Sequence, residues 1–263
     1  MAFKQLSILG RALLTLNVAG IIRAVRCGPI DATRRLSQSF FLVDPFGDPE
    51  AAGARAAFKS IPHVSLSEVL RTKPLIRVVG SYEHVDGSLT WGDIRSLISI
   101  AVDRAPKSVF EIGTFNGYTT RLLAANLPSA TIHTIDLPED LADVNSGSIP
   151  KDDIHLIQRR TVGAEYLADQ AIGNVVQHFG DTATFDFASL GPVELFFIDG
   201  SHTYEYVRND TLKALEIAAP GSTFLWHDCD PTHPGVVRWL AEMVSNGRKV
   251  RRIDGSNVAV MDL

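Results

Sequence analysis

Five short apolar segments recur between residues 108 and 228, and each has the pattern of a buried strand followed by a turn. The clearest is 193–198 (VELFFI), a nearly continuous hydrophobic run typical of strands covered on both faces. Four of the five segments end in an acid, namely Asp136, Asp181, Asp199 and Asp228. Ligands of open α/β sheets bind at the carboxyl ends of the strands, so these acids are candidate site residues.

Helical periodicity separates the strands. In residues 90–101, apolar positions fall at i, i+3, i+4 and i+7, which predicts a helix before the first strand. Further helices are predicted from 121, over 164–178 and over 235–243. Residues 254–257 (DGSN) lie between two short β-prone runs and predict a hairpin. This order favours an α/β fold with a mostly parallel sheet and an antiparallel C-terminal hairpin.

Residues 1–80 lack this regular order and are predicted to form a helical extension to a domain over 81–263. Prolines and glycines divide 28–75 into short helices and turns, and 40–77 is predicted to be a cap or lid. The apolar run 12–22 is too short to span a bilayer. We expect a helix that packs on the domain or on a second subunit in a homodimer, and a membrane-surface helix is the alternative.

The first strand leads into a glycine-bracketed turn. Glu111, Gly113 and Gly117 form the pattern E-x-G-x-x-x-G, which is neither the G-x-G-x-x-G of a dinucleotide loop nor a phosphate loop with its lysine. Glycine lets the backbone turn tightly and a ligand approach it closely. Asp136 follows Glu111 by 25 residues, close to one βαβ step, as expected of an acid that binds ribose hydroxyls.

These motifs and the ordered strand-end acids resemble the class I S-adenosylmethionine (SAM)-dependent methyltransferases, in particular the bacterial "methyltransferase domain 24" group. The resemblance covers residues from about 85 to 263. It implies a doubly wound, Rossmann-like, mostly parallel sheet of seven strands and SAM as the cofactor. The residues it implies for SAM binding are Glu111, Gly113, Thr114, Phe115, Gly117, Asp136, Asp181 and Asp199.

The last two strand ends carry the candidate chemistry. Residues 197–205 (FIDGSHTYE) and 226–230 (WHDCD) resemble small-molecule methyltransferases that act on natural products and sugars. A hydroxyl is a poor nucleophile until it loses its proton, so a base or a metal is needed. His202 and His227 are candidate bases because histidine titrates near neutral pH, and Asp228 is predicted to be catalytic beside them.

Metal assistance is the other route. Some similar enzymes hold Mg²⁺ between carboxylates at these strand ends, which implies Asp199 and Asp228 as ligands of Mg²⁺ or another divalent cation. Cys229 stands where these enzymes have Asn or Asp, and Mg²⁺ prefers oxygen ligands. We therefore favour histidine-assisted transfer, with the metal route left open.

The net charge and the cysteines indicate which partners and which cell compartment to expect. The net charge of −5 provides no basic field for phosphates, so a small-molecule acceptor is expected and nucleic acid is not. The cysteines, Cys27 and Cys229, show no disulfide or metal spacing, which favours the cytoplasm.

The expected function is O-methylation of a small hydroxylated metabolite with SAM as the donor. Two alternatives stay open: a catalytically silent cofactor-binding or scaffold protein of the same fold, and a nicotinamide-dependent oxidoreductase. The missing G-x-G-x-x-G argues against the oxidoreductase.

Overall fold

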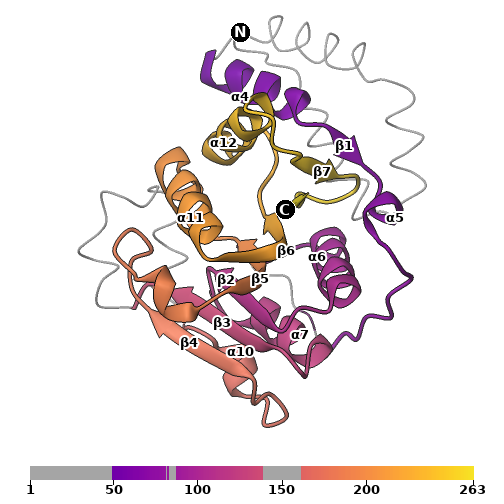
Figure 1. Cartoon of the computed structure of the whole chain (residues 1–263), viewed down its shortest axis with the longest axis vertical. Coiled ribbons are helices and arrows are strands. Elements are labelled where there is room, and N and C mark those ends of the chain that lie inside the picture. The colour runs from indigo at the N-terminus through magenta and orange to yellow at the C-terminus, as the bar shows by residue number, and fades with distance from the viewer. Residues whose placement is uncertain (1–48, 81, 83–86, 139–160) are drawn as a thin grey trace, which may run out of the picture.

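In the computed structural model an eight-stranded sheet runs through the molecule, with helices on both faces (Figure 1). The structure describes residues 49–80, 82, 87–138 and 161–263. The predicted helix over 12–22 and much of the segment between the second and third predicted strands fall outside these residues.

The strands follow the order β1-β7-β8-β6-β5-β2-β3-β4 across the sheet. From β2 to β6 they are parallel, and β8 runs antiparallel to both of its neighbours. The strands are β1 (His63–Val64), β2 (Ser108–Ile112), β3 (Thr131–Asp136), β4 (Val175–Phe179), β5 (Val193–Ile198), β6 (Ala218–Trp226), β7 (Arg251–Ile253) and β8 (Ala259–Asp262).

This topology confirms the doubly wound, mostly parallel sheet and the C-terminal hairpin. The five predicted parallel strands are all present, and 254–257 joins β7 to β8. The resemblance implies seven strands, and the sheet has these seven plus β1, which pairs with β7 at the edge. Part of the predicted N-terminal extension therefore belongs to the same sheet as the rest of the chain.

The helix predicted over 164–178 is wrong for most of its length. Helix α10 covers only Ala164–Leu167, and β4 begins at Val175. A turn at 170–171 and an irregular stretch at 172–174 separate the two. The β-branched pair Val175 and Val176 aligns with β3, so pairing along the sheet overrides the helical pattern.

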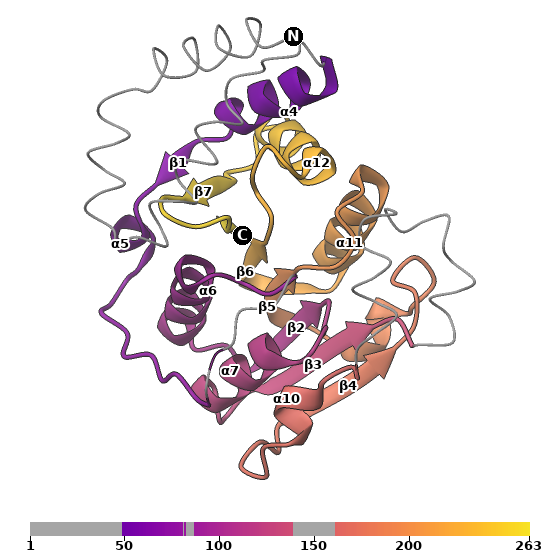
Figure 2. The ribbon, with the colours of Figure 1, turned by 180° about the vertical axis from the view of Figure 1, so that it is seen from behind.

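Two hydrophobic layers enclose the sheet. Figures 1 and 2 show from opposite sides the helices that cover it. On one face α4 (Pro49–Ser60), α11 (Tyr204–Glu216), α12 (Pro234–Ser245) and the short 3₁₀ helix η1 (Phe187–Leu190) pack over the sheet. On the other lie α5 (Leu66–Val69), α6 (Trp91–Arg104) and α7 (Tyr118–Asn126). Neighbouring residues of one strand, such as Val109 and Phe110, serve opposite layers, as the two-residue period of a strand requires.

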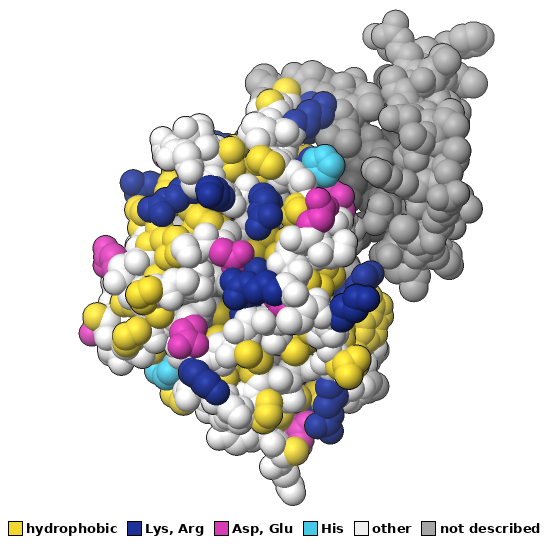
Figure 3. Space-filling view, turned by 45° about the vertical axis from the view of Figure 1, so that its right-hand side comes forward, with side chains coloured by type: hydrophobic (Ala, Val, Ile, Leu, Met, Phe, Trp, Pro, Cys, Tyr) yellow, Lys and Arg dark blue, Asp and Glu magenta, His cyan; other side chains and the backbone are white. Residues whose placement is uncertain are grey.

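The surface is of mixed character. On the face in Figure 3, lysine and arginine side chains lie among acidic and hydrophobic ones. Within the described part of the chain, none of the helices combines the length and hydrophobicity needed to cross a membrane.

Candidate active site

The turn between β2 and α7 is shaped by left-handed backbone. Gly113 has φ +99° and Gly117, at the start of α7, has φ +82°, both in the region that favours glycine. Phe115 also has positive φ, +51°. The Phe115 N–H donates to Asp136 Oδ2 at 2.7 Å, so the turn is fastened to the end of β3.

Neighbouring protein explains these two glycines. A Cβ on Gly113 would lie 2.0 Å from the carbonyl oxygen of Asp199, and one on Gly117 would lie 2.7 Å from Gly163 Cα. Their small size is thus required by close packing against β5 and against the segment before α10. Packing alone accounts for glycine at these two positions, and the role of Gly113 in SAM binding stays a prediction.

Glu111 lies beneath the turn and is fully buried. Its Oε2 accepts hydrogen bonds from the hydroxyls of Thr120 and Thr134. Its Oε1 has no hydrogen-bond partner among the described residues. Burial raises the pKa of Glu111 to about 8, against 4.5 in its ordinary setting, and the nearby charges of Asp199 and Asp136 act in the same direction.

A chain of hydrogen bonds extends from this carboxyl group. Gln177 Nε2 donates to Thr114 Oγ1 at 3.0 Å, and the Thr114 and Thr134 hydroxyls are 2.8 Å apart. Because Thr134 donates to Glu111, its oxygen is placed to accept from Thr114. This network links β2, β3 and β4 below the turn.

The acids at the ends of β3 and β4 have different surroundings. Asp136 accepts backbone N–H groups from Phe115 and from Leu137, each at 2.7 Å, and borders the glycine turn. Asp181 accepts from the Tyr206 hydroxyl at 3.0 Å, which ties it to α11. The structure thus brings Asp136, but not Asp181, into contact with the turn.

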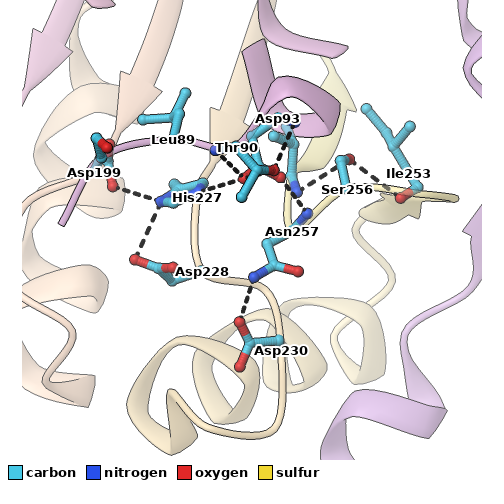
Figure 4. Close-up of polar contacts among 12 residues, drawn as sticks. Leu89, Thr90, Asp93, Asp199, His227, Asp228, Asp230, Ile253, Ser256 and Asn257 are labelled. Carbon is cyan, nitrogen blue, oxygen red and sulfur yellow. Dashed lines mark hydrogen bonds and ion pairs between the residues drawn. The ribbon is translucent and has the colours of Figure 1, made fainter. Parts of the chain in front are cut away.

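The ends of β5 and β6 form a second cluster, drawn in Figure 4 around the imidazole of His227. His227 Nδ1 lies 2.9 Å from Asp199 Oδ1 and 3.1 Å from Asp228 Oδ2. On the other side, Nε2 lies 3.3 Å from Asp93 Oδ2, an ion-pair contact whose geometry falls short of a hydrogen bond. The ring is therefore held between three carboxylates.

Further residues surround Asp228. His202 Nε2 lies 2.9 Å from Asp228 Oδ2, and His233 Nδ1 lies 3.6 Å from Asp228 Oδ1. His233 also contacts Asp230 Oδ2 at 3.3 Å. Of the sequence-predicted catalytic and metal residues, the structure thus brings His202, His227, Asp228 and Asp199 together.

Sequence reasoning missed four members of this region: Asp93, Asp230, His233 and Asn257. Asp93 is fully buried, and its carboxylate accepts from the N–H groups of Thr90 and Asn257. The Asn257 side chain donates to Asp230 (Figure 4). Residues 90–93 (TWGD) have the pattern of a capping box at the start of α6. From the sequence, Asp93 is therefore expected only to cap this helix, and its contact with His227 is not anticipated.

Charge compensation governs the titration of the cluster. Burial opposes ionisation of His227, but the charges of Asp228 and Asp199 outweigh it and raise the pKa of His227 well above its usual value. Burial also opposes ionisation of Asp228, yet the histidines hold the pKa of Asp228 well below its usual range. Burial prevails at Asp199, whose pKa is raised.

A small pocket at this edge of the sheet is lined by residues from the ends of β5 and β6 and from α11 and α12, including His202 and Asp228. Cys229 is not among its lining residues. The cysteine packs in the layer beneath α12, and burial raises the pKa of its thiol to about 12. The cysteine therefore provides no thiolate in this pocket. Its presence in place of Asn or Asp is no argument for or against a metal at the neighbouring groups.

Two sets of donor groups could hold a cation. One consists of Asp199, His227 and Asp228, and the other of His202, Asp228 and His233. In each set the donor atoms lie within 4.8 Å of one another. Carboxylate oxygens with imidazole nitrogens suit divalent transition metals better than Mg²⁺, which prefers oxygen.

A family model described as a methyltransferase domain matches residues 110–229, from β2 to just beyond β6. A search of curated proteins found no match.

Several solved structures are similar to this chain. An O-methyltransferase from Streptomyces achromogenes involved in tomaymycin synthesis, in complex with SAM, is 20% identical over 82% of this chain and 89% of its own, with a TM-score of 0.48. A Bacillus cereus O-methyltransferase in complex with SAH is 17% identical over 68% of this chain and 83% of its own, with a TM-score of 0.44. An SAH-bound methyltransferase from Podospora anserina is 17% identical over 83% of this chain and 97% of its own, with a TM-score of 0.45.

Proposed function

We propose that this chain, whose residues 110–229 match the model of a methyltransferase domain, is a class I methyltransferase that transfers the methyl group of SAM to a hydroxyl oxygen of a small metabolite. The observation that carries this proposal is the histidine–aspartate cluster at the ends of β5 and β6, next to the strand that bears the glycine turn. Such a cluster can take up the proton that a hydroxyl must lose on methylation.

The cofactor side of the site fits SAM. When bound, SAM supplies a methyl group already activated on a sulfonium, and it also carries an ammonium group. Glu111, Asp136 and Asp199 surround the base of the turn with carboxyl groups, and Glu111 Oε1 is buried without a hydrogen-bond partner among the described residues. A bound cation favours the ionised form of such carboxyl groups, and we expect Asp136, at the end of β3, to accept hydrogen bonds from the ribose hydroxyls.

On the acceptor side, the two central histidines have different roles. His227 has carboxylates at both ring nitrogens and a raised pKa, so it remains a cation that balances Asp199 and Asp228. His202 is more accessible, with 25% of its side chain exposed and Nε2 directed to Asp228. In the histidine route, His202 accepts the hydroxyl proton and Asp228 stabilises the resulting charge.

The same cluster offers a cation route. A divalent ion beside Asp228 would favour the deprotonated hydroxyl, as metals do in other enzymes. The sequence-based preference for the histidine route depended on Cys229, whose thiol is buried away from the pocket. Cys229 therefore does not distinguish the histidine route from the cation route. The effect of a chelator on activity does distinguish them.

The test is an activity screen. Full-length protein is incubated with SAM and a panel of hydroxylated metabolites, with and without EDTA, and S-adenosylhomocysteine is measured. We expect product with at least one acceptor and none with the matched deoxy compound. Activity that is unchanged by EDTA supports the histidine route. Activity that EDTA abolishes and that Mn²⁺ or Mg²⁺ restores supports the cation route.

Calorimetry separates the alternatives. We expect binding of SAM and none of NAD; the reverse would indicate an oxidoreductase. Tight SAM binding without turnover of any acceptor would favour a silent cofactor-binding protein.

A further inference from the structure

The outer part of the cluster consists of His202, Asp228 and His233, and we call it the outer triad. His202 follows β5, Asp228 follows β6, and His233 lies at the N-terminus of α12. Their donor atoms converge although the three residues come from two separate loops. No spacing in the sequence assigns His233 to a site: Asp228 and Asp230 precede it closely, but His202, whose ring lies beside it, belongs to another loop.

The distances suit a single bound ion. His202 Nε2 lies 2.9 Å from one carboxylate oxygen of Asp228, and His233 Nδ1 lies 3.6 Å from the other. The rings of His202 and His233 lie side by side, with centroids 4.6 Å apart. Metal–ligand bonds of about 2.0–2.2 Å place neighbouring donor atoms about 3 Å apart, so small side-chain adjustments bring all three onto one ion.

The outer triad is also the accessible one. The side chains of His202 and His233 are 25% and 28% exposed, against 9% for His227 in the inner set. An ion can therefore enter from solvent and keep open coordination positions. The inner set offers less access, because its histidine is enclosed by Asp199, Asp228 and Asp93.

The backbone holds the shared ligand in a strained position. Asp228 has φ +54°, a conformation that non-glycine residues seldom adopt and that is concentrated at functional sites. Hydrogen bonding fixes the loop that follows: the N–H of Cys229 donates to the Asn257 carbonyl at 2.9 Å, and the Asn257 side chain donates to Asp230. The carboxylate is thus directed between the two histidines by a hydrogen-bonded segment.

From this geometry we propose that a divalent transition-metal ion binds to the outer triad, His202, Asp228 and His233. Two imidazole nitrogens and a carboxylate are typical ligands of Zn²⁺, Co²⁺, Mn²⁺ or Fe²⁺. Asp230 Oδ2 lies 3.3 Å from the same nitrogen, His233 Nδ1, so an ion bound there would replace this contact. Only the ion's role as activator of an acceptor hydroxyl rests on the proposed function; its binding does not.

The experiment measures binding of Co²⁺ to full-length protein freed of metal by a chelator, with no cofactor or acceptor present. Calorimetry gives the stoichiometry and visible absorption reports the ligand field. We expect one Co²⁺ ion per protein chain. The affinity for Co²⁺ should be at least tenfold lower in His202→Ala and in His233→Ala than in the wild type. His233→Asn is a second variant, since asparagine also suits a helix start. The control His63→Ala alters an exposed histidine that contacts Asp254 on the far edge of the sheet.

Asp199→Asn separates the two donor sets. If the outer triad binds the ion, this variant keeps Co²⁺ affinity within a few-fold of wild type. Loss of binding in Asp199→Asn but not in the His233 variants would place the ion in the inner set and overturn the proposal, as would no Co²⁺ binding at millimolar concentration. SAM affinity of the same proteins is measured in parallel, so a failed metal site with intact SAM binding leaves the methyltransferase proposal standing.

Discussion

Replacing Glu111 by Gln should change how stability depends on pH. The carboxyl group is fully buried, and burial raises its pKa from 4.5 to about 8. Between these values the folded chain keeps a proton that the unfolded chain has released. The stability that this retained proton contributes is therefore fully present below about pH 4.5 and is lost progressively as the pH rises to about 8.

The size of the effect follows from the same numbers. A difference of one unit in pKa between the folded and unfolded states changes the free energy of unfolding by about 1.36 kcal/mol. The shift of the Glu111 pKa from 4.5 to about 8 therefore corresponds to about 5 kcal/mol. Glutamine has the same shape, accepts from Thr120 and Thr134 through its oxygen, and does not titrate. The variant should gain several kcal/mol relative to wild type between pH 4 and pH 9.

The assay is urea denaturation of cofactor-free protein at a series of pH values. The quantity of interest is the change with pH in the stability difference between variant and wild type, because a constant offset from the buried amide cancels. Glu205→Gln removes an exposed glutamate of α11 and serves as the control. A difference for Glu111→Gln that stays constant from pH 4 to pH 9 would refute the reasoning, since it would mean that Glu111 is ionised in the folded protein.

Three further changes test other parts of the site. Asp136→Asn should weaken SAM binding by on the order of 1.5–3 kcal/mol in calorimetry, the range for hydrogen bonds to charged groups, and unchanged affinity would contradict its place in the cofactor site. Gly113→Ala should destabilise the fold by more than about 1 kcal/mol, because its Cβ would meet a backbone oxygen at 2.0 Å at positive φ, whereas Gly173→Ala has open space and should melt near the wild-type temperature. Asp93→Asn should lower kcat roughly 10- to 100-fold, as is typical when the partner of a site histidine is removed, with the fold intact by circular dichroism. Asp103→Asn, on the same helix but bonded to 71–72, is its control, and equal loss of kcat in both would indicate only a structural role.

The sheet could be predicted because each strand carries its own signal. The run 193–198 is apolar on both faces and ends in Asp199, and the Asp-Gly of 254–255 marks the hairpin. These are local properties of sequence. The helix predicted over 164–178 failed because the last part of that segment is fixed by pairing with β3, a partner distant in sequence.

The site was predictable to the extent that it lies at strand ends. Asp199, His227 and Asp228 follow directly from the parallel order of β5 and β6. Asp93 and His233 reach the same cluster from helix termini, where their local patterns indicate only capping and a turn. Their roles depend on how α6 and α12 pack against the sheet, which no short sequence window contains.

The position of β8 between β6 and β7 constrains the order in which the protein assembles. Among the described strands, β7 pairs with β8 and β1, and β1 pairs with β7 alone, which joins residues 63–64 to 252–253. Closing so long a loop costs entropy before the pairing repays it, so contacts of this kind slow folding. The edge formed by β1 and β7 is therefore expected to form after β8 has paired with β6, once the parallel sheet is already in place.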